Sequence, residues 1–215
     1  MNRLAIFDCD GTLVDSQHNI VMAMNDAFEQ AKRDPPGRAA TLNVVGLSLI
    51  EAMQMLLPGA DHHFHEVMAD HYKKAFWRLR DNGMVEEPLY EGISDAIDAL
   101  DAAGWLLGVA TGKSDRGLAL CLEAHDLAHR FVTLQTADRH PSKPHPSMIE
   151  TAIAEAGASR ETTVMIGDTS FDMLMARNAN VRALGVSWGY HPARELHAAG
   201  AHAVADHPHA IMELL

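Results

Sequence analysis

Apolar residues recur along this chain with two different periods. Within residues 16–85 they return every three to four positions, so that Ile20, Met24 and Phe28 share one face of a predicted helix and a longer stripe runs from Phe64 to Leu79. Beyond residue 85, short apolar runs alternate with helical stretches. The runs lie near residues 106–110, 131–134, 163–167 and 181–186, and the predicted helices near 94–103, 115–124, 146–156 and 171–178. This alternation predicts a parallel sheet with right-handed helical crossovers.

The pattern begins with an apolar run over residues 4–7, which predicts a buried strand. About ninety residues separate Asp15 from the next predicted strand, far more than a short loop and a single helix require. The excess predicts an inserted domain. We therefore expect an α/β fold, in which residues 1–15 and 86–215 form a core around the parallel sheet and residues 16–85 form an inserted α-helical domain.

The composition narrows the class of protein. With 215 residues, of which 47% are hydrophobic and 21% charged, the chain is long enough for one large globular domain with an insert. Its net charge of -12 argues against nucleic acid or an anionic membrane as a partner, because both are bound through clustered lysine and arginine. No apolar stretch approaches the roughly 20 residues of a transmembrane helix, and acids interrupt the first apolar run before it resembles a signal peptide. Two cysteines make no disulfide framework, so we expect a cytoplasmic protein.

Two carboxylates, Asp8 and Asp10, directly follow the first predicted strand. Gly11 favours a turn just after them, so both side chains can project from the carboxyl end of the strand, where open α/β sheets bind ligands. We expect Cys9 between them to point to the other side. Close carboxylates repel each other, unless a divalent cation lies between them or one of them holds a proton. Taken alone, the pair is equally consistent with a loop that carries two solvated acids.

Three further polar segments follow at strand ends or in loops. They are Thr111-Gly112-Lys113-Ser114, Ser142-Lys143-Pro144 and Gly167-Asp168-Thr169-Ser170-Phe171-Asp172. Together with Asp8-Cys9-Asp10-Gly11-Thr12, these segments resemble, in order, the four motifs of the haloacid dehalogenase (HAD) superfamily. Each motif alone is weak, but four in order with suitable strand contexts are specific. The resemblance covers most of residues 4–190, and it implies a Rossmann-like core in which residues 16–85 form a helical cap that selects the substrate.

The resemblance implies a phosphatase that works through an aspartyl-phosphate. Asp8 would attack phosphorus, since a carboxylate is a known nucleophile in phosphoryl transfer. Asp10 would protonate the leaving oxygen and then activate the attacking water. Thr111, Gly112 and Lys143 would hold the phosphoryl group and balance its charge. We expect the partner to be a small phosphorylated metabolite.

The resemblance also implies a metal site. A hard Mg²⁺ ion suits a site made only of oxygen ligands. The implied ligands are Asp8, the backbone carbonyl of Asp10, and Asp168. Asp172 would act from behind them, by orienting Lys143 or the waters of the metal.

Several reactions are known in the superfamily, and the residues favour one of them. A halide needs no proton to leave, so the second acid, Asp10, points away from dehalogenation. The helical insert resembles that of the phosphoglycolate phosphatase-like branch, and Val45-Gly46-Leu47-Ser48 loosely matches its substrate loop. Relatives of β-phosphoglucomutase usually carry an arginine and a histidine where Leu49 and Ile20 stand here, which disfavours a mutase. A catalytically silent binding protein is a third alternative, against which the four intact motifs stand.

The substrate stays open at this point, with phosphoglycolate first and sugar phosphates, nucleotides and pyrophosphate behind it. The oligomeric state, monomer or homodimer, is equally open. Gly112-Lys113-Ser114 is not a phosphate-binding P-loop, because Leu107 stands where that motif requires glycine. Two groups of histidines complete the picture. We interpret His62, His63, His65 and His71 as a polar helix end rather than a zinc site, and we expect His191, His197, His202, His207 and His209 at the surface.

Overall fold

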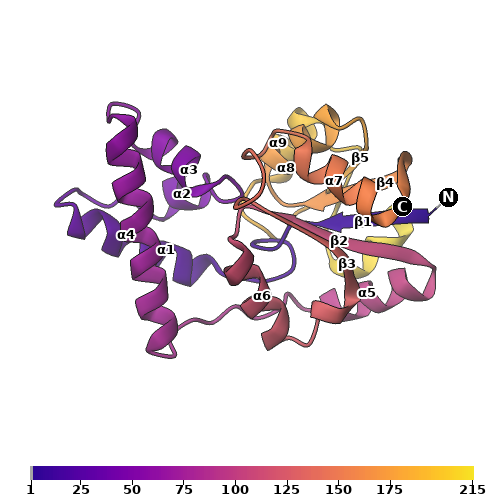
Figure 1. Cartoon of the computed structure of the whole chain (residues 1–215). Coiled ribbons are helices and arrows are strands. Elements are labelled where there is room, and N and C mark those ends of the chain that lie inside the picture. Colours follow the sequence, from indigo (N-terminus) through magenta and orange to yellow (C-terminus); the bar gives the residue numbers. More distant parts are fainter. Residues whose placement is uncertain (1) are drawn as a thin grey trace.

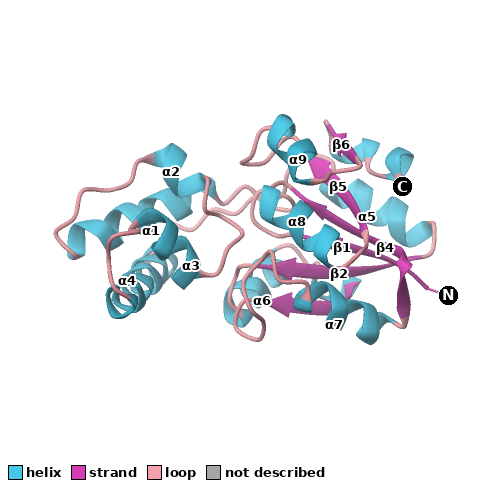
Figure 2. Cartoon of the chain, turned by 90° about the horizontal axis from the view of Figure 1, so that it is seen from above, coloured by secondary structure: helices cyan, strands magenta, loops and turns pink. Residues whose placement is uncertain are grey.

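The computed structural model describes residues 2–215, and its centre is a six-stranded parallel sheet of order β3-β2-β1-β4-β5-β6. The strands are β1 (Asn2–Phe7), β2 (Trp105–Thr111), β3 (Phe131–Thr136), β4 (Ala158–Gly167), β5 (Arg182–Val186) and β6 (Ala203–Ala205). Phe7 lies beside Val109 of β2 and beside Ile166 of β4. The carboxyl ends of these three strands therefore meet at one edge, which faces the inserted helices (Figure 2). The predicted α/β fold is confirmed.

Helices cover both faces of the sheet (Figure 1). On one face lie α5 (Ile93–Ala102) and α6 (Asp115–Ala124), together with the short turns Pro208–Ala210 and Met212–Leu214; on the other lie α7 (Ser147–Ala156), α8 (Ser170–Asn178) and α9 (Ala193–Ala199). A further short turn, Ala128–Arg130, precedes β3. In β1, Ala5 and Phe7 pack toward the first face, and Leu4 and Ile6 toward the second. Burial on both faces explains why this strand is apolar throughout.

Residues 16–85, which we call the cap, hold four helices to one side of the sheet (Figure 1). They are α1 (Gln17–Gln30), α2 (Arg38–Leu42), α3 (Leu49–Leu56) and α4 (His62–Asp81). The cap has a small apolar core of its own, to which α1, α3 and α4 contribute Met24, Ala27, Phe28, Met53, Met68 and Ala69. No helix among residues 2–215 is long and apolar enough to cross a membrane.

The chain enters and leaves the cap through two segments that lie side by side. The backbone N–H of Asp15 donates to the carbonyl of Pro88 at 2.8 Å, and that of Tyr90 donates to the carbonyl of Leu13 at 3.0 Å. Val14 and Leu89 form an isolated antiparallel bridge between them. Both connections therefore lie close to the acids that follow β1.

Candidate active site

Four of the motif residues meet at the carboxyl edge of the sheet. Asp8 follows β1, Asp168 follows β4, Asp172 lies in the first turn of α8, and Lys143 comes from the loop between β3 and α7. All four side chains are buried. The parallel register brings the ends of separate strands together, which explains how residues more than a hundred positions apart share one site.

Asp8, Asp168 and Asp172 form the acid cluster, in which each carboxylate offers an oxygen within 4.8 Å of the others. Burial raises the pKa of Asp8 to about 7, although Lys143 acts to lower it. Burial, reinforced by Asp8 and Asp172, also raises the pKa of Asp168 well above its usual range. One lysine does not balance three buried carboxylates, so the cluster without a further cation favours the protonated forms of Asp8 and Asp168.

One oxygen of this cluster has no partner of its own. Asp8 Oδ1 accepts from the backbone N–H of Cys9 at 2.7 Å, but the buried Oδ2 accepts no hydrogen bond. Asp168 Oδ1 accepts from Thr12 Oγ1 at 2.9 Å, and its Oδ2 accepts from the backbone N–H of Tyr190 at 2.8 Å. A divalent cation bound to oxygens would give Asp8 Oδ2 its missing partner and offset the repulsion, so the residues present fit a Mg²⁺ site.

Lys143 joins two of the acids. Its Nζ lies 3.0 Å from Asp8 Oδ1 and 2.6 Å from Asp172 Oδ1. Burial alone would lower the pKa of Lys143, but Asp172 and Asp8 outweigh burial and raise that pKa above its ordinary value. Asp172 Oδ2 accepts from the backbone N–H and the hydroxyl of Thr169 at 3.0 and 2.7 Å, in the capping box that begins α8. Both oxygens of Asp172 are thus engaged, and this carboxylate fixes Lys143 beside Asp8.

Asp10 lies apart from the acid cluster, in a second network of charges. Its Oδ1 accepts from Lys113 Nζ at 2.6 Å and from the hydroxyl of Ser16. Lys113 Nζ also lies 2.8 Å from Glu87 Oε1, and Glu87 Oε2 lies 2.9 Å from Arg80 Nη2 near the end of α4. Burial would lower the pKa of Lys113, but Asp10 and Glu87 raise it well above its ordinary value. An alternating chain of charges therefore runs from Asp10 to the cap.

Sequence reasoning missed Lys113 and Glu87. Lys113 belongs to the segment Gly112-Lys113-Ser114, which does not fit a P-loop. Its position two residues after Thr111, at the end of β2, is the feature of the sequence that indicates a place in the site. Thr111 Oγ1 accepts from the backbone N–H of Lys113 at 3.2 Å, and both residues line the same cavity as Asp8. Glu87 carries no such signal, because it comes from the segment that leads out of the cap.

Two glycines allow close packing around the acids. Gly11 has a φ of +84°, and a Cβ on it would collide with the carboxylate of Asp168. Gly46, in the cap loop between α2 and α3, has a φ of +96° and would place a Cβ 3.2 Å from Thr169 Oγ1 and 3.9 Å from Asp8 Oδ2. A side chain is strained at such φ values, so glycine suits both positions. The cap loop therefore lies directly over the acid cluster.

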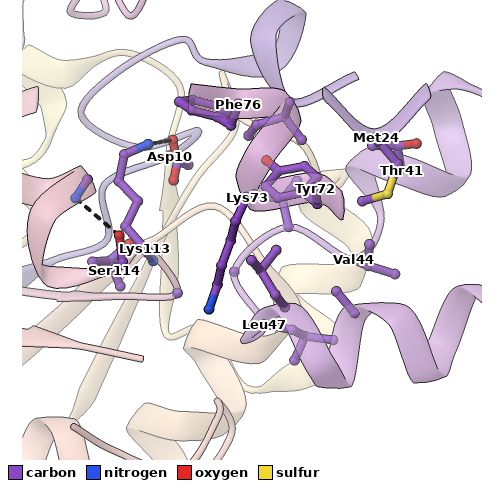
Figure 3. A pocket seen from close by; sticks show the side chains of 18 of the residues that line it. Asp10, Met24, Thr41, Val44, Leu47, Tyr72, Lys73, Phe76, Lys113 and Ser114 are labelled. Atoms are coloured by element: carbon purple, nitrogen blue, oxygen red, sulfur yellow. Dashed lines mark hydrogen bonds and ion pairs between the residues drawn. The ribbon is translucent and has the colours of Figure 1, made fainter. Parts of the chain in front are cut away.

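A cavity of about 340 Å³ lies between the cap and the core (Figure 3). Asp8, Asp10, Thr111 and Gly112 line its core side together with Lys113, Ser114, Arg116, Gly117 and Asp138, and residues of α1 to α4 and the cap loop line the cap side. The structure thus brings all the sequence-predicted residues to this edge of the sheet. Asp168, Asp172 and Lys143 lie next to Asp8 but outside the cavity lining.

The histidines call for one correction. His197, His202, His207 and His209 are exposed, but the expectation of a surface position was wrong for His191, which is buried. His191 Nδ1 accepts from the backbone N–H of Ser170, and Nε2 donates to the carbonyl of Asn43 in the cap. Its ring also packs against Phe171. In α4, His65 bonds to the carbonyl of Leu57, and His62 and His63 lie beside Glu66.

The buried position of His191 predicts a pH-dependent stability. Burial lowers the pKa of His191 below its ordinary value, so the neutral ring stabilises the fold above about pH 6.5, and this contribution is lost as the pH falls through the lowered pKa. Between pH 7.5 and 5.5, the wild type should lose more free energy of unfolding than His191→Gln in urea titrations. His197→Gln, at an exposed position, should behave as the wild type. Equal losses in the wild type and His191→Gln would contradict this role.

The fold and the site together define an enzyme of the α/β class with an aspartate-based centre. Comparison with known proteins gives the family. The family model described as haloacid dehalogenase-like hydrolase matches residues 5–186, and the chain belongs to this family.

Individual relatives agree on the kind of reaction. Probable phosphatase IndB of Dickeya dadantii (strain 3937) is 35% identical over 212 residues, which cover 96% of this chain and 90% of the relative. A phosphoglycolate phosphatase of Agrobacterium fabrum is 31% identical, with 88% of this chain and 82% of the relative covered. The crystal structure of a predicted phosphatase from Clostridium acetobutylicum is similar with a TM-score of 0.87 at 26% identity, and 99% of each chain is covered. These comparisons confirm the expected class, an HAD-family phosphatase.

Proposed function

We propose that the protein is a Mg²⁺-dependent phosphatase that hydrolyses a small-molecule phosphate monoester through an aspartyl-phosphate on Asp8. The observation that carries the proposal is the free buried oxygen, Oδ2, of Asp8, at the floor of a cavity and backed by Lys143. The relatives include a phosphoglycolate phosphatase, which makes phosphoglycolate the first ester to assay.

The chain's residues divide the reaction between them. Asp8 attacks phosphorus, and Lys143 offsets the negative charge that gathers between the carboxylate and the phosphoryl group. Thr111 and Gly112, at the carboxyl end of β2, hold the phosphoryl oxygens. Asp10, positioned by Lys113 and Ser16, protonates the leaving oxygen and then takes a proton from the water that attacks the aspartyl-phosphate.

The Mg²⁺ ion would be held by Asp8, Asp168 and the backbone carbonyl of Asp10, and when bound it supplies positive charge at the phosphoryl oxygens. Asp172 is not proposed as a ligand, because Lys143 and Thr169 occupy its oxygens. It is a positioning residue for Lys143.

The cap is proposed to select the substrate. Ile20 and Leu49 both line the cavity. They are the two positions at which resemblance to a mutase asks for a histidine and an arginine. Apolar side chains there offer no proton carrier and no cation to a bound sugar phosphate, so hydrolysis is favoured over phosphoryl return to a sugar.

Metal removal tests the proposal. Exhaustive chelation should abolish phosphate release, and Mg²⁺ should restore it, whereas Ca²⁺ should support little turnover because its coordination is larger and more flexible. Mg²⁺ should also raise the unfolding temperature of the wild type, and Asp168→Asn should require more Mg²⁺ for both effects. Full activity in the chelated protein would rule out the metal-dependent mechanism.

Asp10→Asn tests the proton transfers. The loss of turnover should be greater for an alkyl phosphate than for 4-nitrophenyl phosphate, because the more basic leaving oxygen needs the acid more. For the alkyl ester we expect a loss of roughly 10²- to 10⁴-fold, measured as phosphate release with Mg²⁺ present. Asp15→Asn, which changes a nearby acid that binds Gln17, is the control. Equal losses for the two esters would mean that Asp10 does not protonate the leaving group.

A further inference from the structure

The cavity over Asp8 is larger and more apolar than a two-carbon leaving group requires. Cavities of roughly 300–1,000 Å³ enclose most of a drug-sized molecule, and this one measures about 340 Å³. Asp8, Asp10, Thr111, Lys113 and Ser114 lie at its core end, where the phosphoryl group would bind, and most of the cap residues in its lining are apolar or aromatic. The cap side is built from Met24, Val44, Leu47, Tyr72 and Phe76, which surround the hollow in Figure 3.

The cap wall includes aromatic faces as well as aliphatic side chains. Tyr72 and Phe76 lie one turn apart on α4 with ring centroids 6.1 Å apart, and Trp77 joins them in the lining. Val44 and Leu47, from the cap loop between α2 and α3, also line this wall. Such walls favour a flat apolar body, because aromatic rings gain from stacked or edge-to-face contacts beyond the burial of their area.

Among residues 2–215, some of the lysine and arginine side chains that line the cavity form ion pairs with acids, and others do not. Lys113 is bound to Asp10 and Glu87, and Arg80 is bound to Glu87. Lys73, on α4, forms no ion pair with any residue of 2–215, and its amine extends into the space between the cap and the core (Figure 3). Arg116 stacks on Trp77 with its guanidinium 3.7 Å from the ring centroid. In a chain of net charge -12, Lys73 stands out as a cation available to a ligand.

We propose that the substrate is the phosphate monoester of a flat aromatic alcohol that carries a second anionic group, with the ring against the cap wall and the anion at Lys73. This proposal rests on the proposed phosphatase function and names its substrate class. The ester oxygen points to Asp10, and the ring replaces water along Leu47, Tyr72 and Phe76. Glycolate, with two carbons, would leave most of this apolar wall uncovered.

The experiment compares esters of equally basic alcohols, so that only the body of the leaving group differs. With Mg²⁺ present, kcat/KM should be roughly tenfold to a hundredfold higher for 2-phenylethyl phosphate than for ethyl phosphate, as expected for burying one aromatic ring. It should also exceed that for phosphoglycolate. A carboxylate at the para position of the phenyl ring should raise kcat/KM again, by about threefold, because the ion pair with Lys73 is partly exposed.

Lys73→Met tests the anion contact, and the neighbouring Lys74→Met is its control. Lys74 lies on the same helix but pairs with Asp70 at 2.7 Å and does not line the cavity. The ratio of kcat/KM between the carboxylated and the plain phenylethyl ester should fall to about one in Lys73→Met and stay at the wild-type value in Lys74→Met. A ratio unaffected by Lys73→Met would overturn the anionic part of the proposal.

The outcomes separate this proposal from the phosphatase function itself. If kcat/KM for ethyl phosphate or phosphoglycolate equals or exceeds that for the phenylethyl ester, the protein is a phosphatase but the aromatic substrate class is wrong. If even 4-nitrophenyl phosphate releases no phosphate with Mg²⁺, the phosphatase proposal fails and the substrate class fails with it.

Discussion

Asp8→Asn should lower the turnover of 4-nitrophenyl phosphate by roughly four to six orders of magnitude, the range seen when a covalent nucleophile is removed. The amide is nearly isosteric with the carboxylate, but it cannot attack phosphorus. Lys143 keeps its partner Asp172 at 2.6 Å, so the fold should persist. Because burial disfavours the charged form of Asp8, the metal-free variant should unfold at a temperature no lower than the metal-free wild type.

The control for this change is Asp15→Asn. Asp15 is a partly buried acid that binds the side chain of Gln17, and it lies outside the acid cluster. Its replacement should leave turnover within a few-fold of the wild type. If Asp8→Asn instead retains more than about a tenth of wild-type turnover, another residue attacks phosphorus.

Lys143→Met should reduce both stability and activity. The change leaves Asp8 and Asp172 buried without their counter-charge, and breaking a buried pair in this way costs about 3–5 kcal/mol. Turnover should fall by roughly 10²- to 10³-fold or more, since a cation aimed at the developing negative charge is lost. Urea denaturation and phosphate release measure the two effects separately.

A second variant separates charge balance from packing. Adding Asp172→Asn to Lys143→Met removes one of the two buried acids that have lost their counter-charge. The double variant should therefore be more stable than Lys143→Met. Its activity should stay low, because no cation returns to Asp8. An unchanged free energy of unfolding in Lys143→Met would show that the lysine does not offset the acids.

Most elements of the fold follow from the periodicity of the sequence. The strands predicted near 106–110, 131–134, 163–167 and 181–186 fall within or across β2, β3, β4 and β5, and the helix predicted at 115–124 coincides with α6. Long, strongly periodic segments carry such signals. The elements α9 and β6 were not predicted, because seven and three residues are too few to establish a period.

The site residues that directly follow a strand could be predicted from the sequence, whereas residues from other segments were harder to predict. Asp8 and Asp168 follow neighbouring parallel strands, which places them together by topology alone. Contact with Lys143 was one of two roles expected of Asp172, the other being to orient the waters of the metal, and Lys143 Nζ donates to Asp172 Oδ1 in the structure. Glu87 and His191 could not be predicted. Their contacts depend on how the cap returns to the core, and no local pattern in the sequence encodes that path.

The central strand β1 is also the earliest of the six strands along the chain, so it leaves the ribosome before its neighbours. The neighbours of β1 are β2, which begins at Trp105, and β4, which begins at Ala158. Leu4 and Ile6 must therefore stay unpaired while about a hundred further residues are translated, and such contacts across long stretches of chain form slowly. The contacts of α1 with α4 span far fewer residues and are complete much earlier. During translation, the helices of the cap are therefore complete long before Asp168 and Asp172 are synthesised and can join Asp8 in the acid cluster.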